Sequence, residues 1–233
     1  MSRNNIAFKG ICTIILFITI GVSQVSMGIQ NVDLTAGTLD IYMTNTAGCS
    51  YCADSTYNNN TQDWWDKKDD CENLADTTWV SYENITEEAC AAKPGFQSQT
   101  GGWWFDGQVG GVQIELTGGI TIDAPTGASG GTAEATGWMA NTSNDPLNLI
   151  LLFTITGAYL PAGEGILTQV TFSNYTAGTG ICFGEDTGSS GETAVSAAGS
   201  DYVAANWGAC YCDGQLDDCG VCNGENANKD CAG

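Results

Sequence analysis

The sequence contains no histidine, and Lys and Arg together account for only 6 of its 233 residues. Without histidine, neither a Ser-His-Asp nor a Cys-His catalytic constellation can form, and a His-ligated metal site is equally excluded. Arg3 and Lys9 lie near the N-terminus, so the remainder of the chain has lysines but no arginine. Nucleic-acid binding needs a basic surface and a phosphate clamp needs arginine, so the composition excludes both.

Long hydrophobic runs are also scarce. Near the N-terminus, two basic residues precede an apolar run over residues 11–22, and small residues follow it. This order is typical of a secretory signal peptide, which we predict to span residues 1–28 with cleavage near Ser26 or Gly28. The run is short for a membrane span, which needs about 20 residues, although a transmembrane anchor is the alternative interpretation. We therefore predict secretion, with no membrane span after the signal peptide is removed.

Acidic residues dominate the charge. The sequence holds 27 Asp and Glu, and its formal net charge is −21. Such a surface favours solubility and self-repulsion in an exposed setting, and it suits calcium. Because acids are so numerous, a pair such as Asp63 with Asp66 carries no information about glycoside hydrolysis. We predict that the chain is not an enzyme.

Apolar alternation indicates β-strands in the middle of the chain. Residues 112–116 alternate apolar and polar side chains, which is the period of a strand with one buried face. Residues 120–122 continue that pattern after two glycines. Residues 147–155 are apolar at nearly every position, which predicts a central strand covered on both faces.

Alternation returns further along the chain, over residues 166–172. There, Ile166, Val170 and Phe172 are predicted to lie on one side of a strand. The 31 glycines favour short strands and tight turns, and residues 127–131 are predicted to be a turn rather than a helix. The predicted fold class is an all-β sandwich.

An insertion separates a first predicted strand, 39–43, from the rest of the sandwich. Residues from about 45 to 105 are polar and Asn-rich and contain four cysteines, so bridges must supply the stability that burial cannot. Residues 182–186 and 202–207 are predicted to be the last strands. The predicted domains are a signal peptide over 1–28, a sandwich with a disulfide-rich insertion over 29–208, and an irregular Cys-rich C-terminal tail over 209–233.

Ten cysteines remain once Cys12 in the signal peptide is set aside. In a secreted chain this number predicts about five disulfides. The spacing of Cys49 and Cys52, and that of the tail cysteines, would also allow zinc. Five cysteines lie in the tail and one lies alone, which suggests that Cys182 bonds the tail to the sandwich. The disulfide candidates are Cys49, Cys52, Cys71, Cys90, Cys182, Cys210, Cys212, Cys219, Cys222 and Cys231.

The order "GGVQIELTG", "GASGG", an apolar strand and "ITGAYLPAGEGILTQVTF" resembles the cohesin and carbohydrate-binding-module sandwich. It is most similar to versions in large secreted bacterial surface proteins, and it covers roughly residues 35–45 and 108–207. The tail, with "DDCGVCNG" and "DCAG", resembles units repeated in secreted multidomain proteins. The resemblance implies an all-β, antiparallel, jelly-roll-like β-sandwich that binds proteins or polysaccharides without catalysis. The insertion departs from the family pattern, so no contact residues are transferred.

Two tryptophan pairs in the insertion are candidates for carbohydrate binding. Aromatic rings stack on sugar faces, and nearby carboxylates can accept hydrogen bonds from sugar hydroxyls. Two alternatives remain open: the rings fill a small disulfide-linked core, or they form a protein-binding patch. The candidate residues are Trp64, Trp65, Trp103, Trp104, Asp66 and Asp106.

Calcium is the predicted cofactor because the tail offers many oxygen ligands among glycines. Calcium takes about six to eight such ligands from flexible turns, although the spacing is not that of an EF-hand. A solvated acidic linker without an ion is the alternative. Glu185 and Asp186 with Asp201 form a second candidate. The tail candidates are Asp213, Asp217, Asp218, Asn223 and Asp230.

These observations predict a non-catalytic, secreted or cell-surface binding module whose partner is a polysaccharide or a surface protein. The alternative is a structural unit of a surface layer, stalk or adhesin, stiffened by disulfides and calcium.

Overall fold

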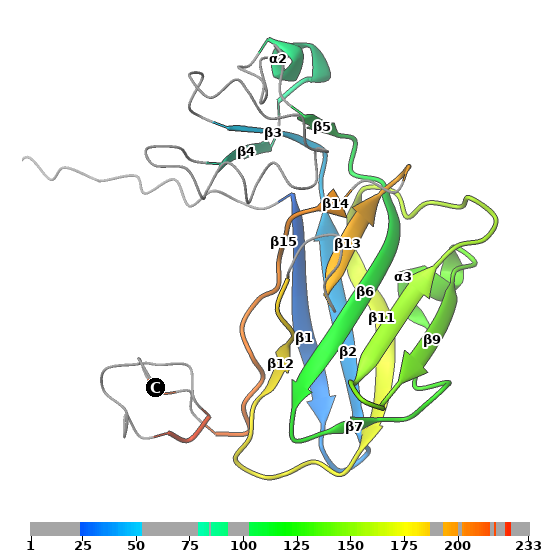
Figure 1. The fold of residues 1–233 in the computed structure, drawn as a ribbon, viewed down its shortest axis with the longest axis vertical. Coiled ribbons are helices and arrows are strands. Elements are labelled where there is room, and N and C mark those ends of the chain that lie inside the picture. The colour runs from blue at the N-terminus through cyan, green and yellow to red at the C-terminus, as the bar shows by residue number, and fades with distance from the viewer. Residues whose placement is uncertain are drawn as a thin grey trace, which may run out of the picture.

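The computed structural model describes residues 24–52, 79–83, 85–92, 103–186, 193–199, 202–214, 217 and 222–224. Strands dominate these residues, and the two helices within them are short (Figure 1). The elements in chain order are β1 (Val25–Asp33), β2 (Thr38–Asn45), β3 (Gly48–Cys52), β4 (Trp79–Glu83), α2 (Glu87–Ala91), β5 (Trp103–Phe105), β6 (Val109–Gly118), β7 (Thr121–Ile122), β8 (Ala128–Ser129), α3 (Gly131–Ala135), β9 (Met139–Ser143), β10 (Leu149–Phe153), β11 (Gly163–Ser173), β12 (Ile181–Phe183), β13 (Ala194–Ala197), β14 (Tyr202–Val203) and β15 (Ala205–Asn206).

Two large sheets and one small sheet make up the fold, which confirms the predicted all-β sandwich. The first large sheet has the order β15-β1-β2-β11-β7, and β8 also pairs with β11. The second has the order β14-β13-β6-β10-β9, and β12 also pairs with β6. The small sheet, β4-β3-β5, lies at one end of the sandwich (Figure 1). Among the described strands every pairing is antiparallel except that of β1 with β15.

The core lies between the two large sheets and follows the period of two in the sequence. Leu39 and Ile41 of β2 face Ile114 of β6 and Ile150 of β10 across it, and all four are fully buried. Complete burial of an aliphatic side chain of this size stabilises a fold by about 1.5–3 kcal/mol. Alternation along each strand therefore positions the sheets against each other.

The first strand of the sandwich, β1, begins earlier than the sequence predicts. Val25 and Met27 are buried in the core, and β1 pairs with β2 from Val25 onward. A sandwich domain beginning at residue 29, after cleavage near Ser26 or Gly28, would lack half of this strand. In the structure β1 therefore starts four residues before the predicted beginning of the sandwich domain. This difference has a physical cause, since small and apolar residues at the start of β1 have the composition of a cleavage region.

The strand β10 is buried on one face only, so the predicted cover on both faces is wrong. Ile150 and Leu152 are fully buried, whereas Leu151 is 41% exposed. Burial thus alternates along a strand whose sequence is apolar throughout. Ile155, at the end of the predicted run, lies beyond the strand and is exposed.

A β-bulge corrects the predicted register of β11. The pairing of β11 with β2 shifts between Ile166 and Thr168. An extra residue turns the following side chains to the opposite face. As a result Leu167 is buried and Ile166 is exposed, while Val170 and Phe172 face the core as predicted.

The glycine-rich turn after β7 contains more structure than the sequence predicts. It holds the two-residue strand β8 and the five-residue helix α3, which begins at Gly131. A Cβ at Gly131 would lie 2.4 Å from the carbonyl oxygen of Leu167, so this helix packs closely on β11. Trp138, just after α3, is buried and donates to the Ala158 carbonyl over 2.6 Å.

A buried carboxylate joins three strands of the first sheet. Asp40 of β2 is only 6% exposed, although it lies on the outer face of the sheet. Its oxygens accept hydrogen bonds from the amides of Asn31 (2.8 Å) and Gln169 (3.2 Å). No described residue is a Lys or an Arg, so within this part of the chain neutral donors have to stabilise the charge.

We expect Asp40→Ala to lower the free energy of unfolding by about 1–3 kcal/mol, because two amide donors lose their acceptor. Chemical denaturation measures this loss. Asp123→Ala is the matched control, since it removes the same charge from an exposed position. Equal denaturation midpoints for the two variants would show that the hydrogen bonds of Asp40 do not contribute to stability.

Candidate functional site

The small sheet is continuous with the sandwich because β2 leads into β3 after two residues. At this junction the buried amide of Asn45 donates to the carbonyl oxygens of Gly107 and Pro161. These bonds join the end of β2 to the segment that follows β5 and to the loop before β11. The central strand of the small sheet therefore leaves the sandwich in a fixed direction.

The helix α2 is attached to the small sheet by a disulfide. Cys49 of β3 bonds Cys90 of α2, with a Cα–Cα distance of 5.5 Å, and both residues are fully buried. Thr86 caps the helix by accepting from the N–H of Ala89 over 3.1 Å. Glu87 and Glu88 in the first turn also stabilise this end, because their negative charges interact favourably with the positive end of the helix dipole. This confirms one of the predicted bridges in the insertion; Cys71 and the side chain of Cys52 lie outside the described residues.

The inner face of the small sheet extends the sandwich core. Phe105 is buried, and Trp103 stacks on it with ring centroids 5.8 Å apart and packs against the core cluster. On this same face the hydroxyls of Ser50 and Ser81 lie 2.8 Å apart and join β3 to β4. Trp103 therefore has the core-filling role that the sequence leaves open, and it is not part of an open surface.

The opposite face of the small sheet carries Tyr51, Tyr82 and Trp104, which we call the aromatic face. Strand register places Tyr82 and Trp104 on either side of Cys49. Tyr51 lies two residues further along β3 and stacks on Tyr82, with ring centroids 5.9 Å apart and planes at 16°. Tyr82 is 42% exposed, while Tyr51 and Trp104 are half-buried.

The two tyrosines of the aromatic face interact through their hydroxyls, whose oxygens lie 3.5 Å apart. This hydrogen bond, together with burial and the nearby phenol of Tyr82, raises the pKa of Tyr51. The Tyr51 phenol therefore keeps its proton at neutral pH.

The structure thus revises the predicted carbohydrate-binding residues. Trp104 faces outward, whereas Trp103 faces the core. The carboxylate of Asp106 accepts from the backbone N–H (2.8 Å) and side-chain amide (2.7 Å) of Gln108, so it shapes a turn. Trp64, Trp65 and Asp66 lie outside the described residues. Sequence reasoning missed Tyr51 and Tyr82, which only the pairing of β3 with β4 brings together.

A shallow groove of about 370 Å³ lies on the second sheet, on the face turned away from the core. Leu151 and Phe153 of β10 line it, and Gly110 and Gly111 of β6 contribute no side chains. A Cβ at Gly110 would lie 2.6 Å from the carbonyl oxygen of Ala197, so close packing of β6 against β13 requires glycine there. The described lining contains no charged side chain, so the groove is uncharged.

The tail is attached to the sandwich at β12. Cys182 bonds Cys210, as the sequence suggests, and Ile181 and Tyr211 exchange two backbone hydrogen bonds of 2.9 and 2.8 Å. A second tail disulfide joins Cys212 and Cys222. Cys219 and Cys231 lie outside the described residues.

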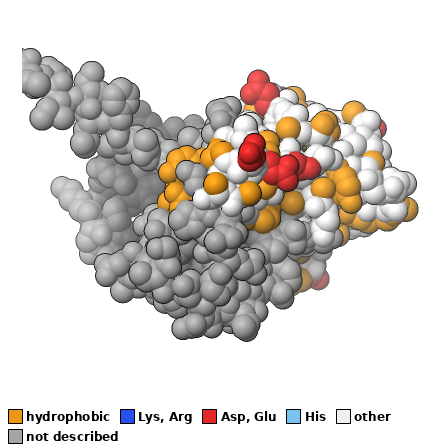
Figure 2. Space-filling view, turned by 90° about the horizontal axis from the view of Figure 1, so that it is seen from above, with side chains coloured by type: hydrophobic (Ala, Val, Ile, Leu, Met, Phe, Trp, Pro, Cys, Tyr) orange, Lys and Arg blue, Asp and Glu red, His pale blue; other side chains and the backbone are white. Residues whose placement is uncertain are grey.

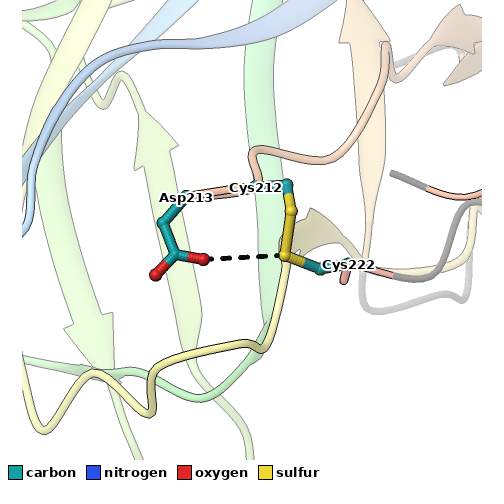
Figure 3. A group of neighbouring side chains, drawn as sticks. All are labelled: Cys212, Asp213 and Cys222. Carbon is teal, nitrogen blue, oxygen red and sulfur yellow. Dashed lines mark hydrogen bonds between the residues drawn. A yellow bond between two sulfur atoms is a disulfide. The ribbon is translucent and has the colours of Figure 1, made fainter. Parts of the chain in front are cut away.

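One cluster in the tail has metal-like composition, but its chemistry does not suit a metal. Ligand atoms of Cys212, Asp213 and Cys222 lie within 4.8 Å of one another, and Asp213 Oδ1 is 3.7 Å from Cys222 Sγ (Figure 3). Zinc binds cysteine as the thiolate, and these two sulfurs are joined in a disulfide. Zinc therefore does not fit this cluster.

The predicted calcium ligands are only partly brought together. Asp213 Oδ1 lies 3.5 Å from the amide nitrogen of Asn223. Asp217 is also among the described residues, whereas Asp218 and Asp230 lie outside them. In the second candidate, Asp186 accepts from Tyr202 Oη (2.8 Å) and Trp207 Nε1 (2.7 Å). Both its oxygens thus have protein donors, which indicates a structural role there. Calcium in the tail stays a prediction.

Acidic side chains are the only charged ones on the described surface. Figure 2, which views the end of the molecule that bears the small sheet, shows red acidic groups beside apolar ones and no described basic group. Glu87 and Glu88 on α2 are exposed near the aromatic face. The described part of this end therefore repels anionic ligands.

Comparisons with protein-family models, with curated proteins and with solved structures found no match to this chain. Among the described residues, no helix combines the length and the apolar character that crossing a membrane requires.

The two faces of the small sheet predict different effects for neighbouring tryptophans. We expect Trp103→Ala to lower the free energy of unfolding by about 3–5 kcal/mol if its site cannot collapse, because it removes a ring that packs on the core. Trp104→Ala should cost clearly less. Denaturant unfolding measures both, and a larger loss for Trp104→Ala would reverse the assignment of the faces.

Alkaline pH should weaken the attachment of the tail. Burial, and secondly the negative charge of Asp213, raise the pKa of Tyr175 above 10.0. Because the folded-state pKa is the higher one, the stabilisation is complete below the unfolded-state pKa and is lost as pH rises through the folded-state value. Stability measured at pH about 9 and about 11 should fall more in the wild type than in Tyr175→Phe. An equal fall in stability in the two proteins would show that ionisation of Tyr175 does not destabilise the fold.

Proposed function

We propose that this chain is a non-catalytic binding module, displayed outside the cell, that engages an uncharged polysaccharide through its aromatic face. The observation that carries the proposal is the grouping of Tyr51, Tyr82 and Trp104 on one side of a disulfide-anchored sheet. The sheet lies at an end of the sandwich, where a long polymer can pass without meeting the large sheets (Figure 1).

Ring stacking is the physical basis of the proposed binding. The face of an aromatic ring is negative, and the C–H groups on one side of a pyranose ring are weakly positive, so the two attract at contact. Tyr82 is the most exposed ring of the face, and its hydroxyl can also exchange hydrogen bonds with a sugar. A fixed backbone favours this contact, because little freedom is lost when the sugar binds.

Charge limits the class of polysaccharide. A uronate or a sulfated chain would approach a protein whose full sequence has a formal net charge of −21 and whose described residues include no Lys or Arg. Repulsion opposes that approach, so we infer a neutral chain.

The absence of catalysis is inferred from composition. The sequence has no histidine to act as a general base. The described aromatic face consists of Tyr51, Tyr82 and Trp104, so it does not supply the pair of carboxylates that glycoside hydrolysis uses. Three described disulfides are compatible with an extracellular protein, and the resemblance to cohesin and carbohydrate-binding sandwiches agrees with a binding role.

The central test is retention on insoluble neutral polysaccharides. Tyr82→Ala should weaken binding by about tenfold, which corresponds to about 1.4 kcal/mol, because one stacking ring is lost. Trp104→Ala should weaken it too. Affinity for cellulose, chitin and an insoluble mannan, measured by depletion from solution, checks this.

Tyr159→Ala is the matched control, because Tyr159 is 40% exposed but lies in the loop between β10 and β11. Its affinity should equal that of the wild type. If the wild type, Tyr82→Ala and Trp104→Ala are all retained equally well, the aromatic face does not bind the polysaccharide. If the wild type is retained on none of the polymers, the proposed function is wrong.

The groove on the second sheet favours a second candidate, binding of a partner protein. Its apolar walls include the exposed Leu151, and β10 and β6 hold its shape by regular pairing. Leu151→Asp would place a charge there without touching the small sheet. If Leu151→Asp abolishes binding of a partner protein and Tyr82→Ala leaves that binding intact, the groove is favoured over the aromatic face.

A purely structural unit of a surface assembly is the third candidate, and it requires stiffening by disulfides and calcium. A calcium-dependent unit should melt at a higher temperature with calcium than with excess chelator, because an ion that binds only the folded state stabilises it. Identical melting temperatures would show that calcium does not stabilise the folded chain.

A further inference from the structure

Two tyrosines from different strands meet at their reactive ends. The ring centroids of Tyr51 and Tyr82 are 5.9 Å apart, but their hydroxyl oxygens are only 3.5 Å apart. The rings therefore converge toward the hydroxyls, and the carbons ortho to each hydroxyl lie at this converging end. These are the carbons at which a tyrosyl radical couples to another.

Strand pairing imposes this approach. Tyr51 opposes Val80, and Tyr82 opposes Cys49, so the two tyrosines occupy diagonal positions on one face of an antiparallel pair. Diagonal neighbours are within reach of each other when both side chains are aromatic. The Cys49–Cys90 disulfide and the 2.8 Å contact between Ser50 and Ser81 hold the register of the two strands.

The pair is open to an oxidant from outside. Tyr82 is 42% exposed, and the disulfides of the chain are stable in the oxidising surroundings where peroxidases work. We propose that Tyr51 and Tyr82 are a site of oxidative cross-linking, joined by a carbon–carbon bond between their ortho positions by a haem peroxidase with hydrogen peroxide. The proposal goes beyond polysaccharide binding and does not depend on it.

The reaction balances without any group from the chain other than the two phenols. Each phenol gives up one electron and its hydroxyl proton, and hydrogen peroxide takes up both pairs and becomes two molecules of water. The two radicals couple at their ortho carbons. The hydrogen on each coupled carbon then moves to its oxygen, which restores both aromatic rings. The product has lost two hydrogen atoms and holds β3 to β4 covalently.

The consequence would be a second covalent cross-link among the described residues of the insertion. Tyr51 and Tyr82 are 31 residues apart, so the bond closes a loop that no described disulfide closes. A closed loop restricts the unfolded chain and so raises the stability of the folded one. Reducing agents break disulfides and leave this bond intact.

The test uses the full chain, treated at low concentration with a haem peroxidase and hydrogen peroxide. We expect the blue fluorescence of dityrosine in a product that remains a monomer. Lys67 and Lys68 lie between the two tyrosines in the sequence, so reduction followed by a lysine-specific protease separates their peptides unless the new bond holds them. Mass spectrometry should find the two peptides joined, lighter than their sum by two hydrogen atoms.

Tyr82→Phe and Tyr51→Phe keep the stacked ring and remove the coupling hydroxyl, so each should abolish the joined peptide while circular dichroism stays unchanged. Tyr159→Phe, at a tyrosine of similar exposure, should leave its yield unchanged. A joined peptide that persists in Tyr82→Phe, or fluorescence confined to oligomers and dependent on Tyr159, would overturn the proposal. So would oxidation of the chain with no joined peptide. Retention on polysaccharide is measured separately, so failure of either proposal is distinguishable from failure of the other.

Discussion

The hydrogen bonds of Asn45 fix the relation between the sandwich and the small sheet. Its buried amide reaches the carbonyls of Gly107 and Pro161, which belong to segments far apart in the sequence. Three residues later the chain is already in β3, the central strand of the small sheet. The direction in which the aromatic face points is thus decided inside the sandwich, by an amide that has no contact with that face itself.

The described structure is also notable for how it accommodates negative charge. In a chain whose described part contains no cation, carboxylates interact with amides, hydroxyls, indoles and backbone N–H groups. Asp40 joins three strands in this way, and Asp186 ties Tyr202 and Trp207 together. Hydrogen bonds of this kind depend on geometry and lose less to salt than exposed ion pairs do. The acidic surface and the ordered interior are therefore compatible.

Sequence reasoning identified the class of fold because apolar and polar side chains alternate along a strand that has one buried face. Alternation identified β2, β6 and β11. The number of cysteines in the tail suggested the link from Cys182 to the tail. Sequence reasoning misjudged β10, because a wholly apolar strand does not reveal that one face is exposed, and it missed the bulge at Ile166, because pairing partners decide bulges. At the candidate site it named Trp104 but missed both tyrosines, whose proximity depends on the register of β3 with β4.

The Cys182–Cys210 bond has a mechanical consequence. Residues between these cysteines, including β13, β14 and β15, form a covalently closed loop. Tension applied to the chain beyond residue 210 crosses the sulfur–sulfur bond into β12, whose neighbour β6 is a central strand of the second sheet. The three late strands then carry none of the load. Pulling on the tail would load β6 inside the second sheet, while β13 and β14 at the edge of that sheet and β15 at the edge of the first sheet would stay unloaded.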